Sequence, residues 1–458
     1  MDAGHPGKYR KGEGEVKALF RKSFLFILCT YALLIGGLVY WQAIADLEGH
    51  PLNPTGYAVF RQPRGAIVDR DGKPLAESVS TDVGYRRVYA SPSVSHITGY
   101  FHQRYGMTGL EKAYNSSLSQ GQTVRTTIAL PLQKHMEELM AGKVGAAVAM
   151  DPKTGAVLAL VSYPYVDGNR LDESWSDYLQ DERSPFVNRA VQGQYPPGSA
   201  IKPLVLGAAF AERAAYPEQP WVDRGAVELE GRAIKNFQGQ ALGRITTLEA
   251  LAHSSNVVFA LLAAELGPKL LTALSQFGLG EIPPLPLPMS RGRLPSPEQS
   301  DYGWGQIGIG HGDLLVTPLQ MASAVSAIAN GGKLMRPLLV QEVRGGWRLP
   351  RVQLPAAYTQ VIPEWAAAAV RDGMVLAVER GTAREAALPG IPTAGKTGTA
   401  QTGAGQDHSW FVGFAPAYDP EVAVVVVLEH GGIASQTAAP LGGAVLQAAL
   451  AACTPQGM

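Results

Sequence analysis

Hydrophobic residues along this chain fall into one long uninterrupted run and a series of shorter periodic segments. The long run, SFLFILCTYALLIGGLVYWQAIA, covers residues 23–45 without a charged residue. At about 1.5 Å per residue, a helix of this length crosses the roughly 30 Å hydrocarbon core of a bilayer. We therefore predict a transmembrane helix over 23–45. A cleaved signal peptide is the alternative, because Ala43-Ile44-Ala45 is typical of a cleavage site, but the run exceeds the roughly 7–15 apolar residues of such peptides.

Basic residues before this run predict its orientation. The positive-inside tendency keeps lysine and arginine near a membrane helix in the cytoplasm, and Tyr40 and Trp41 suit the opposite interface. The basic residues are Lys8, Arg10, Lys11, Lys17, Arg21 and Lys22. We expect residues 1–22 to be cytoplasmic, the helix to cross the cell membrane once, and the chain from residue 46 onwards to lie outside the cytoplasm.

The segments after the membrane helix predict a stalk and two domains. Residues 46–62 mix proline, glycine and polar residues, which is typical of a short stalk. The sequence RGAIVDRDGKPLAES, residues 64–78, reads as strand, turn and strand, and it opens a small β-rich pedestal that we place over 63–140. A larger domain is expected over 141–458.

The larger domain changes from strands to helices and back to strands. A hairpin is predicted over 145–163, where two apolar segments flank a Pro-Lys-Thr-Gly turn. Apolar residues at helical spacing then predict helices over 203–213, 247–253, 257–266, 317–330 and, at the end, 441–451. Residues rich in valine, threonine and aromatics predict strands over 393–402, 408–416 and 421–430. This order predicts an α+β domain with helices packed on an antiparallel sheet.

Composition excludes several classes of function. The 458 residues contain 39 Lys+Arg and 39 Asp+Glu, so the chain lacks the basic excess expected of a nucleic-acid-binding protein. Its two cysteines, Cys29 and Cys453, are too few for a disulfide framework or a cysteine-rich metal site. We interpret the nine histidines as packed or polar side chains, and we predict neither a metal nor a cofactor.

One short motif predicts a nucleophile. Pro196, Pro197 and Gly198 force a turn in YPPGSAIKPL, which places Ser199 near the start of a helix. Residues three apart share a helix face, so the Lys202 amine can approach the Ser199 hydroxyl. A serine hydroxyl is a weak nucleophile that needs a nearby base, and a buried lysine with a lowered pKa can serve.

Two further motifs, taken together with this one, indicate a specific class of enzyme. Ser254-Ser255-Asn256 follows a predicted helix, and Lys396-Thr397-Gly398-Thr399 lies in a predicted strand. In this order SxxK, SxN and KTG are the signatures of the penicillin-recognising serine acyltransferases. With them the chain resembles the class B penicillin-binding proteins, membrane-anchored peptidoglycan D,D-transpeptidases.

The resemblance extends over nearly the whole chain after the membrane helix. Segments that carry it are RGAIVDRDG (64–72), GAAVAMDPKTGAVLALVS (145–162) and TPLQMASAVSAIANGG (317–332). HITGY (96–100) and GLEKAYN (109–115) are similar to the short-pedestal subgroup of actinobacteria and some firmicutes. The family implies a penicillin-binding or β-lactamase-like domain, with an antiparallel sheet covered by helices on both faces.

The resemblance also implies a catalytic role for five residues. Ser199 would attack the carbonyl of a D-Ala-D-Ala bond in a peptidoglycan stem peptide, and Lys202 would take its proton. Ser254 and Asn256 would relay the proton and hold the substrate amide. Lys396 would keep Lys202 neutral and attract the substrate carboxylate.

Three more residues are implied in substrate binding. The Thr397 and Thr399 hydroxyls would bind the carboxylate, and Gly398 would let the substrate backbone approach the strand. The backbone N–H groups of Ser199 and Thr399 would form the oxyanion hole. β-Lactams would trap Ser199, and a separate membrane glycan polymerase would be a partner, because the roughly 80 residues between stalk and catalytic domain leave no room there for a glycosyltransferase domain.

Two alternatives remain open at this point. Gly390–Thr397, GIPTAGKT, matches the GxxxxGK[ST] pattern of a phosphate-binding loop and would imply nucleotide binding, but such a loop needs a helix directly after it, and the sequence here is glycine-rich. Within the resembled family, a D,D-carboxypeptidase or a β-lactam sensor would carry the same three motifs. The membrane anchor and the pedestal favour a transpeptidase.

Overall fold

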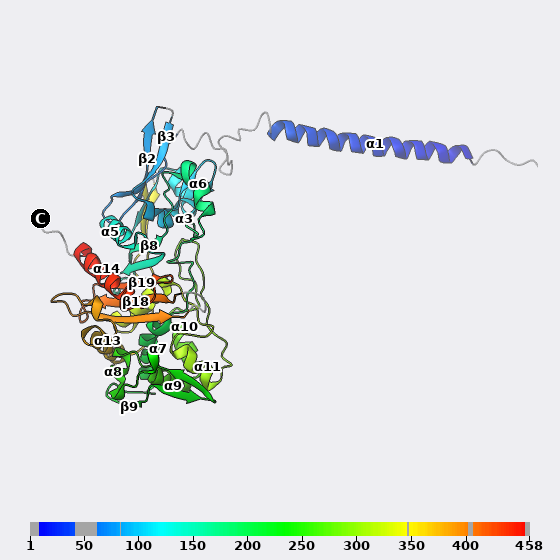
Figure 1. The fold of residues 1–458 in the computed structure, drawn as a ribbon. Coiled ribbons are helices and arrows are strands. Elements are labelled where there is room, and N and C mark those ends of the chain that lie inside the picture. Colours follow the sequence, from blue (N-terminus) through cyan, green and yellow to red (C-terminus); the bar gives the residue numbers. More distant parts are fainter. Residues whose placement is uncertain (1–8, 42–61, 83, 346–347, 402–405, 454–458) are drawn as a thin grey trace, which may run out of the picture. The chain divides into compact units, whose positions relative to one another are not determined.

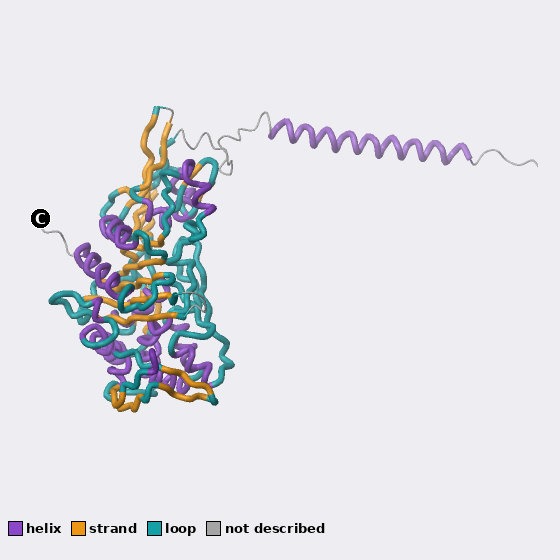
Figure 2. Tube along the Cα trace, in the orientation of Figure 1, coloured by secondary structure: helices purple, strands orange, loops and turns teal. Residues whose placement is uncertain are grey.

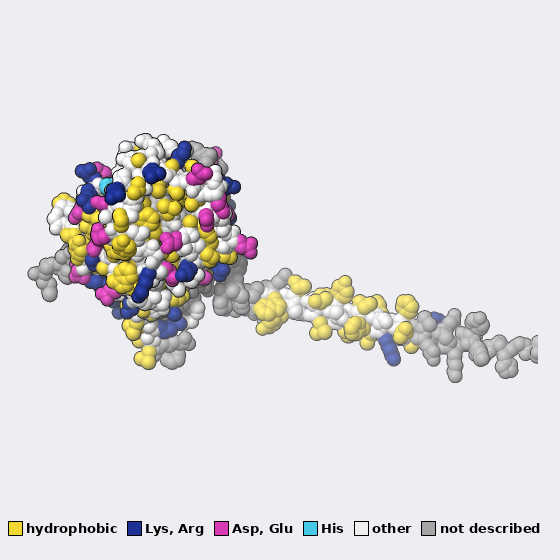
Figure 3. All heavy atoms as spheres, turned by 90° about the horizontal axis from the view of Figure 1, so that it is seen from below, with side chains coloured by type: hydrophobic (Ala, Val, Ile, Leu, Met, Phe, Trp, Pro, Cys, Tyr) yellow, Lys and Arg dark blue, Asp and Glu magenta, His cyan; other side chains and the backbone are white. Residues whose placement is uncertain are grey.

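The computed structural model describes residues 9–41, 62–82, 84–345, 348–401 and 406–453, and the chain divides into two units, 1–62 and 63–458. The first unit contains helix α1, Tyr9–Val39. Within it Lys17–Val39 has a mean hydropathy of 1.9 and none of its apolar window is buried, so it is long and apolar enough to cross a membrane. Figure 3 shows hydrophobic side chains along its described part. Residues 42–45 of the predicted span and residues 46–61 of the predicted stalk lie outside the described residues.

A five-stranded antiparallel sheet forms the centre of the second unit (Figures 1 and 2). Its order is β17-β18-β19-β7-β8, so β17 is an edge strand. The strands are β7 (Gly145–Met150), β8 (Val157–Tyr163), β17 (Ala394–Ala400), β18 (His408–Ala415) and β19 (Val422–Leu428). The predicted hairpin and the three predicted later strands are all present in it, with ends that differ by a few residues.

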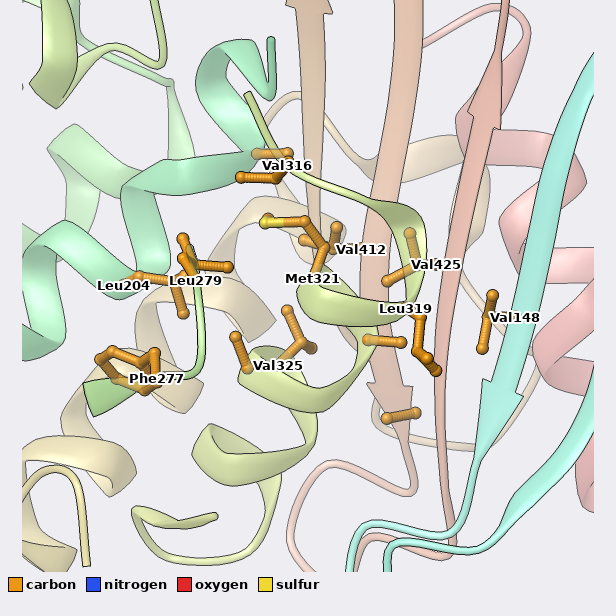
Figure 4. Packing of buried hydrophobic residues seen from close by; sticks show 14 of the residues in the cluster. Val148, Leu204, Phe277, Leu279, Val316, Leu319, Met321, Val325, Val412 and Val425 are labelled. Atoms are coloured by element: carbon orange, nitrogen blue, oxygen red, sulfur yellow. The ribbon is translucent and has the colours of Figure 1, made fainter. Parts of the chain in front are cut away.

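Helices cover both faces of this sheet, which confirms the predicted α+β fold. Alternate strand residues point to opposite faces. On one face Val148, Val412 and Val425 pack against α12 (Pro318–Ala329), as Figure 4 shows. On the other, Ala147 and Val424 belong to a second core with α5 (Leu130–Met140) and α14 (Ala438–Cys453). Because both faces are buried, β7 and β19 have no exposed residue and read as continuous apolar runs.

The helical part follows the hairpin in sequence and lies beside the edge strand β17. It comprises α7 (Lys202–Ala211), α8 (Thr247–Ala252), α9 (Asn256–Leu266), α10 (Pro268–Gln276), α11 (Asp301–Gly308) and α13 (Glu364–Glu379). Helices predicted over 203–213, 247–253, 257–266 and 317–330 correspond to α7, α8, α9 and α12. Two antiparallel strand pairs extend this part: β9 (Pro220–Asp223) with β12 (Gly243–Thr246), and β10 (Ala226–Leu229) with β11 (Arg232–Lys235). These short strands were not predicted, because their mixed polar residues show no clear alternation.

A six-stranded sheet organises the pedestal, in the order β15-β14-β6-β1-β2-β3. Its strands are β1 (Ile67–Val68), β2 (Pro74–Thr81), β3 (Gly84–Tyr89), β6 (Thr123–Thr126), β14 (Val340–Gly345) and β15 (Arg348–Val352). Two of these strands therefore come from residues 340–352, far along the chain from the region 63–140. The smaller elements nearby are α2 (Ser95–Thr98), α3 (Gly109–Ala113), α4 (Asn115–Ser119), α6 (Leu171–Gln180), β4 (Phe101–His102) and β5 (Gly106–Met107). A separate strand pair, β13 (Lys333–Met335) with β16 (Ala357–Gln360), packs beside α12.

Candidate active site

Ser199 lies in a tight turn that packs directly on the edge strand β17. It belongs to the 3-10 helix Gly198–Ile201, immediately before α7. Gly198 has a φ of +52°, and a Cβ there would lie 2.5 Å from the Thr399 carbonyl oxygen. A Cβ on Gly398 would lie 2.6 Å from the Ala200 nitrogen. Two glycines thus allow the turn and the strand to touch backbone to backbone, which brings Ser199 beside Thr399.

Lys202, one turn after Ser199, is fully buried and points to the SxN motif. Its Nζ donates to the Ser254 carbonyl oxygen at 2.7 Å and to Asn256 Oδ1 at 2.7 Å, and it lies 3.2 Å from the Ser254 hydroxyl. Among the described residues, no hydrogen bond joins the Ser199 hydroxyl to this amine, so the predicted direct contact is not made in this state.

Lys396 reaches the same serine from β17. It is also fully buried, and its Nζ donates to the Ser254 hydroxyl at 2.9 Å and to the Thr397 carbonyl oxygen at 2.8 Å. Ser254, at a φ of +61°, therefore holds its hydroxyl between two lysine side chains. Side chains from all three sequence motifs thus meet at one point.

Burial and mutual repulsion shift the pKa values of both lysines. Desolvation by burial lowers the pKa of Lys202 well below its usual value, the charge of Lys396 lowers it further, and Asp223 raises it. Burial lowers the pKa of Lys396 to about 7. The pKa of His311 is also lowered, by burial and then by the Lys202 charge. Burial and the neighbouring Lys396 charge therefore both favour the neutral, proton-accepting form of Lys202.

Two residues behind the SxN motif were missed by the sequence analysis. Asp223, 1% exposed at the end of β9, accepts hydrogen bonds from Ser255 Oγ at 2.6 Å and from Asn236 Nδ2 at 2.8 and 2.9 Å. Asn236 Oδ1 in turn accepts from the Asn256 backbone N–H at 2.7 Å and the Val257 backbone N–H at 3.3 Å. A buried carboxylate and an amide thus fix the start of α9, and no local sequence signal marks them.

The two threonines of β17 differ in their surroundings. Thr397 is 6% exposed, and its hydroxyl lies 2.8 Å from the Thr382 hydroxyl. Thr399 is partly exposed and pairs with Ser409 of β18. Thr382, which follows α13, was also missed by the sequence analysis. Access to solvent is therefore greater at Thr399 than at Thr397.

The structure contradicts the phosphate-binding-loop alternative. Lys396 lies inside strand β17, which continues to Ala400 and pairs with β18, where a phosphate-binding loop would require a helix. Its amine is buried against Ser254. Across the described ranges of the chain, no group of three or more His, Cys, Asp or Glu side chains is arranged to hold a metal ion.

Comparisons with known proteins match both parts of the second unit. The model of the penicillin binding protein transpeptidase domain matches residues 145–450, more than half of the chain, and that of the penicillin binding protein A dimerisation domain matches 64–140. Peptidoglycan D,D-transpeptidase PbpA of Mycolicibacterium smegmatis is 32% identical over 94% of this chain and 98% of its own length. Peptidoglycan D,D-transpeptidase MrdA of Haemophilus influenzae is 32% identical over 73% of this chain and 57% of its own length.

Solved structures resemble the same region. The imipenem acyl-enzyme complex of penicillin-binding protein A from M. tuberculosis has a TM-score of 0.81 at 31% identity and covers 86% of this chain and 99% of that protein chain. The D,D-transpeptidase domain of a peptidoglycan glycosyltransferase from Eggerthella lenta has a TM-score of 0.80 at 33% identity, over 85% of this chain and 99% of the other.

Proposed function

This chain belongs to the penicillin-binding protein transpeptidases, of the class B fold, and on that premise we propose that Ser199 is the nucleophile of its peptidoglycan D,D-transpeptidase reaction. The protein is a serine-type acyltransferase that acts on peptidoglycan and binds β-lactams. The observation that carries the residue assignment is the meeting of Lys202 and Lys396 at the Ser254 hydroxyl, beside the turn that holds Ser199.

In the first half-reaction Ser199 Oγ bonds to the carbonyl carbon of the penultimate D-Ala. The amide C–N bond then breaks, the proton from Ser199 passes to the leaving amine, and D-Ala departs. The backbone N–H groups of Ser199 and Thr399 are proposed as the oxyanion donors, since the glycine contacts hold the turn and the strand together. In the second half-reaction an acceptor amine attacks the ester carbon, and its proton returns to Ser199 Oγ.

Lys202 is proposed as the base. As an ammonium it would donate three hydrogen bonds, whereas as a neutral amine it donates two and offers one lone pair. Its two short contacts go to a carbonyl oxygen and an amide oxygen, which can only accept. The longer contact to the Ser254 hydroxyl can reverse, because a hydroxyl both donates and accepts. Ser254 is therefore suited to relay a proton between Ser199, Lys202 and the leaving amine, and Asn256 to hold Lys202 and the substrate amide.

Lys396, Thr397 and Thr399 are proposed to recognise the terminal carboxylate of the donor. Lys396 supplies positive charge, and Thr399 offers a partly exposed hydroxyl. The Thr397 hydroxyl contacts Thr382, so a carboxylate bound at Thr397 would share that pair of hydroxyls. Gly398 has no side chain that would block the substrate backbone at the strand edge.

The experiment that tests this assignment is covalent labelling of the full chain in detergent with a fluorescent penicillin. We expect Ser199→Ala to lose all labelling, while Ser176→Ala, an exposed serine on α6, keeps it. A Ser199→Ala chain that retains its thermal stability and is still labelled would place the nucleophile elsewhere.

The protein is anchored to the membrane by α1, and we propose that its catalytic domain faces outward. The described basic residues of the helix, Lys17, Arg21 and Lys22, precede its apolar part, which supports a cytoplasmic N-terminus. Protease digestion of intact cells should then remove the catalytic domain.

We also propose a membrane glycan polymerase as partner, because the two matched domains, 64–140 and 145–450, are a dimerisation and a transpeptidase domain. Crosslinking in membranes followed by mass spectrometry tests this.

A further inference from the structure

A buried tyrosine connects the segment that leads into the nucleophile turn with the central sheet. Tyr195, four residues before Ser199, is 6% exposed, and its backbone N–H and C=O both pair with Val316. The Tyr195 hydroxyl donates to Glu429 Oε1 at 2.6 Å. Glu429 directly follows β19, and its backbone N–H donates to the Val144 carbonyl oxygen. One side-chain contact therefore joins the nucleophile segment to the end of a central strand.

A buried arginine holds the Glu429 carboxylate in place. Arg189 Nε donates to Glu429 Oε1 at 2.7 Å, so one oxygen accepts from both Arg189 and Tyr195. The two other guanidinium nitrogens donate to the backbone carbonyl oxygens of Ser184 and Arg183. Burial, and after it the charge of Glu429, raises the pKa of Tyr195, so the tyrosine stays a phenol and donates. Because charge-assisted hydrogen bonds are short and directional, the carboxylate keeps one orientation.

Close packing restricts the Tyr195 ring as well. A Cβ on Gly193 would lie 2.5 Å from both the hydroxyl oxygen and the Cε2 atom of Tyr195, so the ring lies directly against the Gly193 backbone. Trp410, fully buried on β18, meets the tyrosine ring edge-on with 6.1 Å between the ring centroids. The Trp410 indole N–H also donates to the Pro196 carbonyl oxygen at 3.1 Å. The same indole thus fixes the tyrosine ring and the residue that follows it.

Only two residues, Pro197 and Gly198, separate this fixed point from the nucleophile. The Pro197 ring locks its backbone φ, which is −75°, and Gly198 packs against the Thr399 carbonyl oxygen. The connecting segment therefore has little rotational freedom to absorb a shift at Tyr195. Such a shift would move the Ser199 hydroxyl and backbone N–H relative to β17, and misplacement of reacting groups by a fraction of an ångström slows a reaction.

We propose that Tyr195 and Glu429 are positioning residues for the acylation of Ser199. The carboxylate held by Arg189 fixes the Tyr195 hydroxyl, and the short proline-containing segment transmits that position to the nucleophile. Neither residue belongs to the three sequence motifs, and neither is assigned a contact with the substrate. This inference rests on the proposed function, because it requires Ser199 to be the nucleophile. Breaking the contact should slow bond formation without weakening the binding that precedes it.

The concentration dependence of acylation by a fluorescent penicillin tests the proposal on the full chain in detergent. Stopped-flow traces separate the dissociation constant of the non-covalent complex from the rate constant of the covalent step. Tyr195→Phe removes only the hydroxyl and keeps the ring against Gly193 and Trp410. We expect the covalent rate constant to fall by about tenfold and the dissociation constant to stay within about twofold. The control Tyr165→Phe removes a hydroxyl that donates to the Glu137 carbonyl oxygen on α5, and it should change neither constant.

A second variant tests whether Glu429 acts through Tyr195. Glu429→Gln keeps an oxygen that can accept from Tyr195 but loses the negative charge that pairs with Arg189. We expect this substitution to lower the covalent rate constant by about threefold in the wild-type chain and to have no further effect in the Tyr195→Phe chain. Equal losses in both backgrounds would show that Glu429 does not act through the tyrosine and would overturn the proposal.

Two results with Tyr195→Phe alone would also overturn it. Wild-type values of both constants would show that the hydroxyl does not position Ser199. A raised dissociation constant with an unchanged covalent rate constant would make Tyr195 part of the binding surface instead. Titration with excess penicillin counts the folded chains, so partial unfolding lowers the labelled fraction and not the rate constant. Failure of the proposed function appears in a different measurement, as penicillin labelling that survives Ser199→Ala.

Discussion

Lys396 donates a hydrogen bond of 2.9 Å to the hydroxyl of Ser254, 142 residues away along the chain. The same hydroxyl lies 3.2 Å from the amine of Lys202. Two buried cations at one hydroxyl repel each other, and burial disfavours both charges. The arrangement therefore holds one lysine neutral, as a base requires, while the other remains available to carry charge.

This pairing predicts a bell-shaped pH dependence of acylation by a penicillin. Below the lowered pKa of Lys202 the base is protonated and acylation slows. Above pH about 7 Lys396 loses its proton, and its attraction for the ligand carboxylate is lost. We expect the second-order acylation rate to fall on both sides of an optimum at or below neutral pH. Stopped-flow fluorescence with a fluorescent penicillin measures it.

Lys396→Arg tests the alkaline side of this profile. Arginine keeps its charge to a pKa above about 12, so the decline above neutral pH should disappear even if the absolute rate drops. An unaltered alkaline decline in Lys396→Arg would assign that titration to a group other than Lys396.

Lys202→Arg should lose acylation almost completely, by about a thousandfold or more, because a guanidinium cannot accept a proton. Quantitative penicillin labelling over time measures the loss. The exposed Lys134→Arg on α5 serves as the matched control and should label normally. Wild-type acylation in Lys202→Arg would disprove the base assignment.

Asn236→Ala should slow acylation by about tenfold or more without changing the alkaline pKa of the profile. The substitution removes the acceptor for the Asn256 and Val257 backbone N–H groups, so the SxN turn loses its position. Two unpaired N–H groups also cost about 1–3 kcal/mol each, which a thermal melt detects. Asn330→Ala, at the end of α12, is the control for loss of an amide that bonds only to its own turn. Normal acylation in an Asn236→Ala chain that melts at lower temperature would show that Asn236 stabilises the fold but does not position the SxN motif.

Gly398→Ala should also slow acylation by at least about tenfold, because the new Cβ would lie 2.6 Å from the Ala200 nitrogen and 2.8 Å from the Pro197 oxygen. Backbone atoms cannot rotate away, so the Ser199 turn and β17 must separate, and the two oxyanion donors separate with them. Gly390→Ala, where φ is +72° but no atom lies within 4 Å of the new Cβ, controls for the backbone strain of a glycine change without a steric contact at the Ser199 turn. An acylation rate for Gly398→Ala equal to that of Gly390→Ala would contradict the close-packing account.

The interior of the catalytic domain followed well from local patterns. The continuous apolar runs of β7 and β19 and the helical spacing of α9 and α12 are local properties, and tertiary packing agrees with them. The short strands β9 to β12 and the pairing of β14 with β6 were not foreseen, because a pairing of four residues carries no clear periodic signal and depends on which segments meet in the folded chain.

By itself the sequence determined the fold class, the apolar helix and the three motifs, because each depends on neighbouring residues along one segment. The tertiary structure decided which atoms meet. In the folded chain the Lys202 amine bonds to Ser254 and Asn256, whereas the i, i+3 spacing had suggested a contact with Ser199. Folding also places Asp223 and Asn236 behind the SxN motif. Hydrogen bonds between residues separated by tens or hundreds of positions depend on how the segments pack, and a one-dimensional pattern contains no record of that geometry.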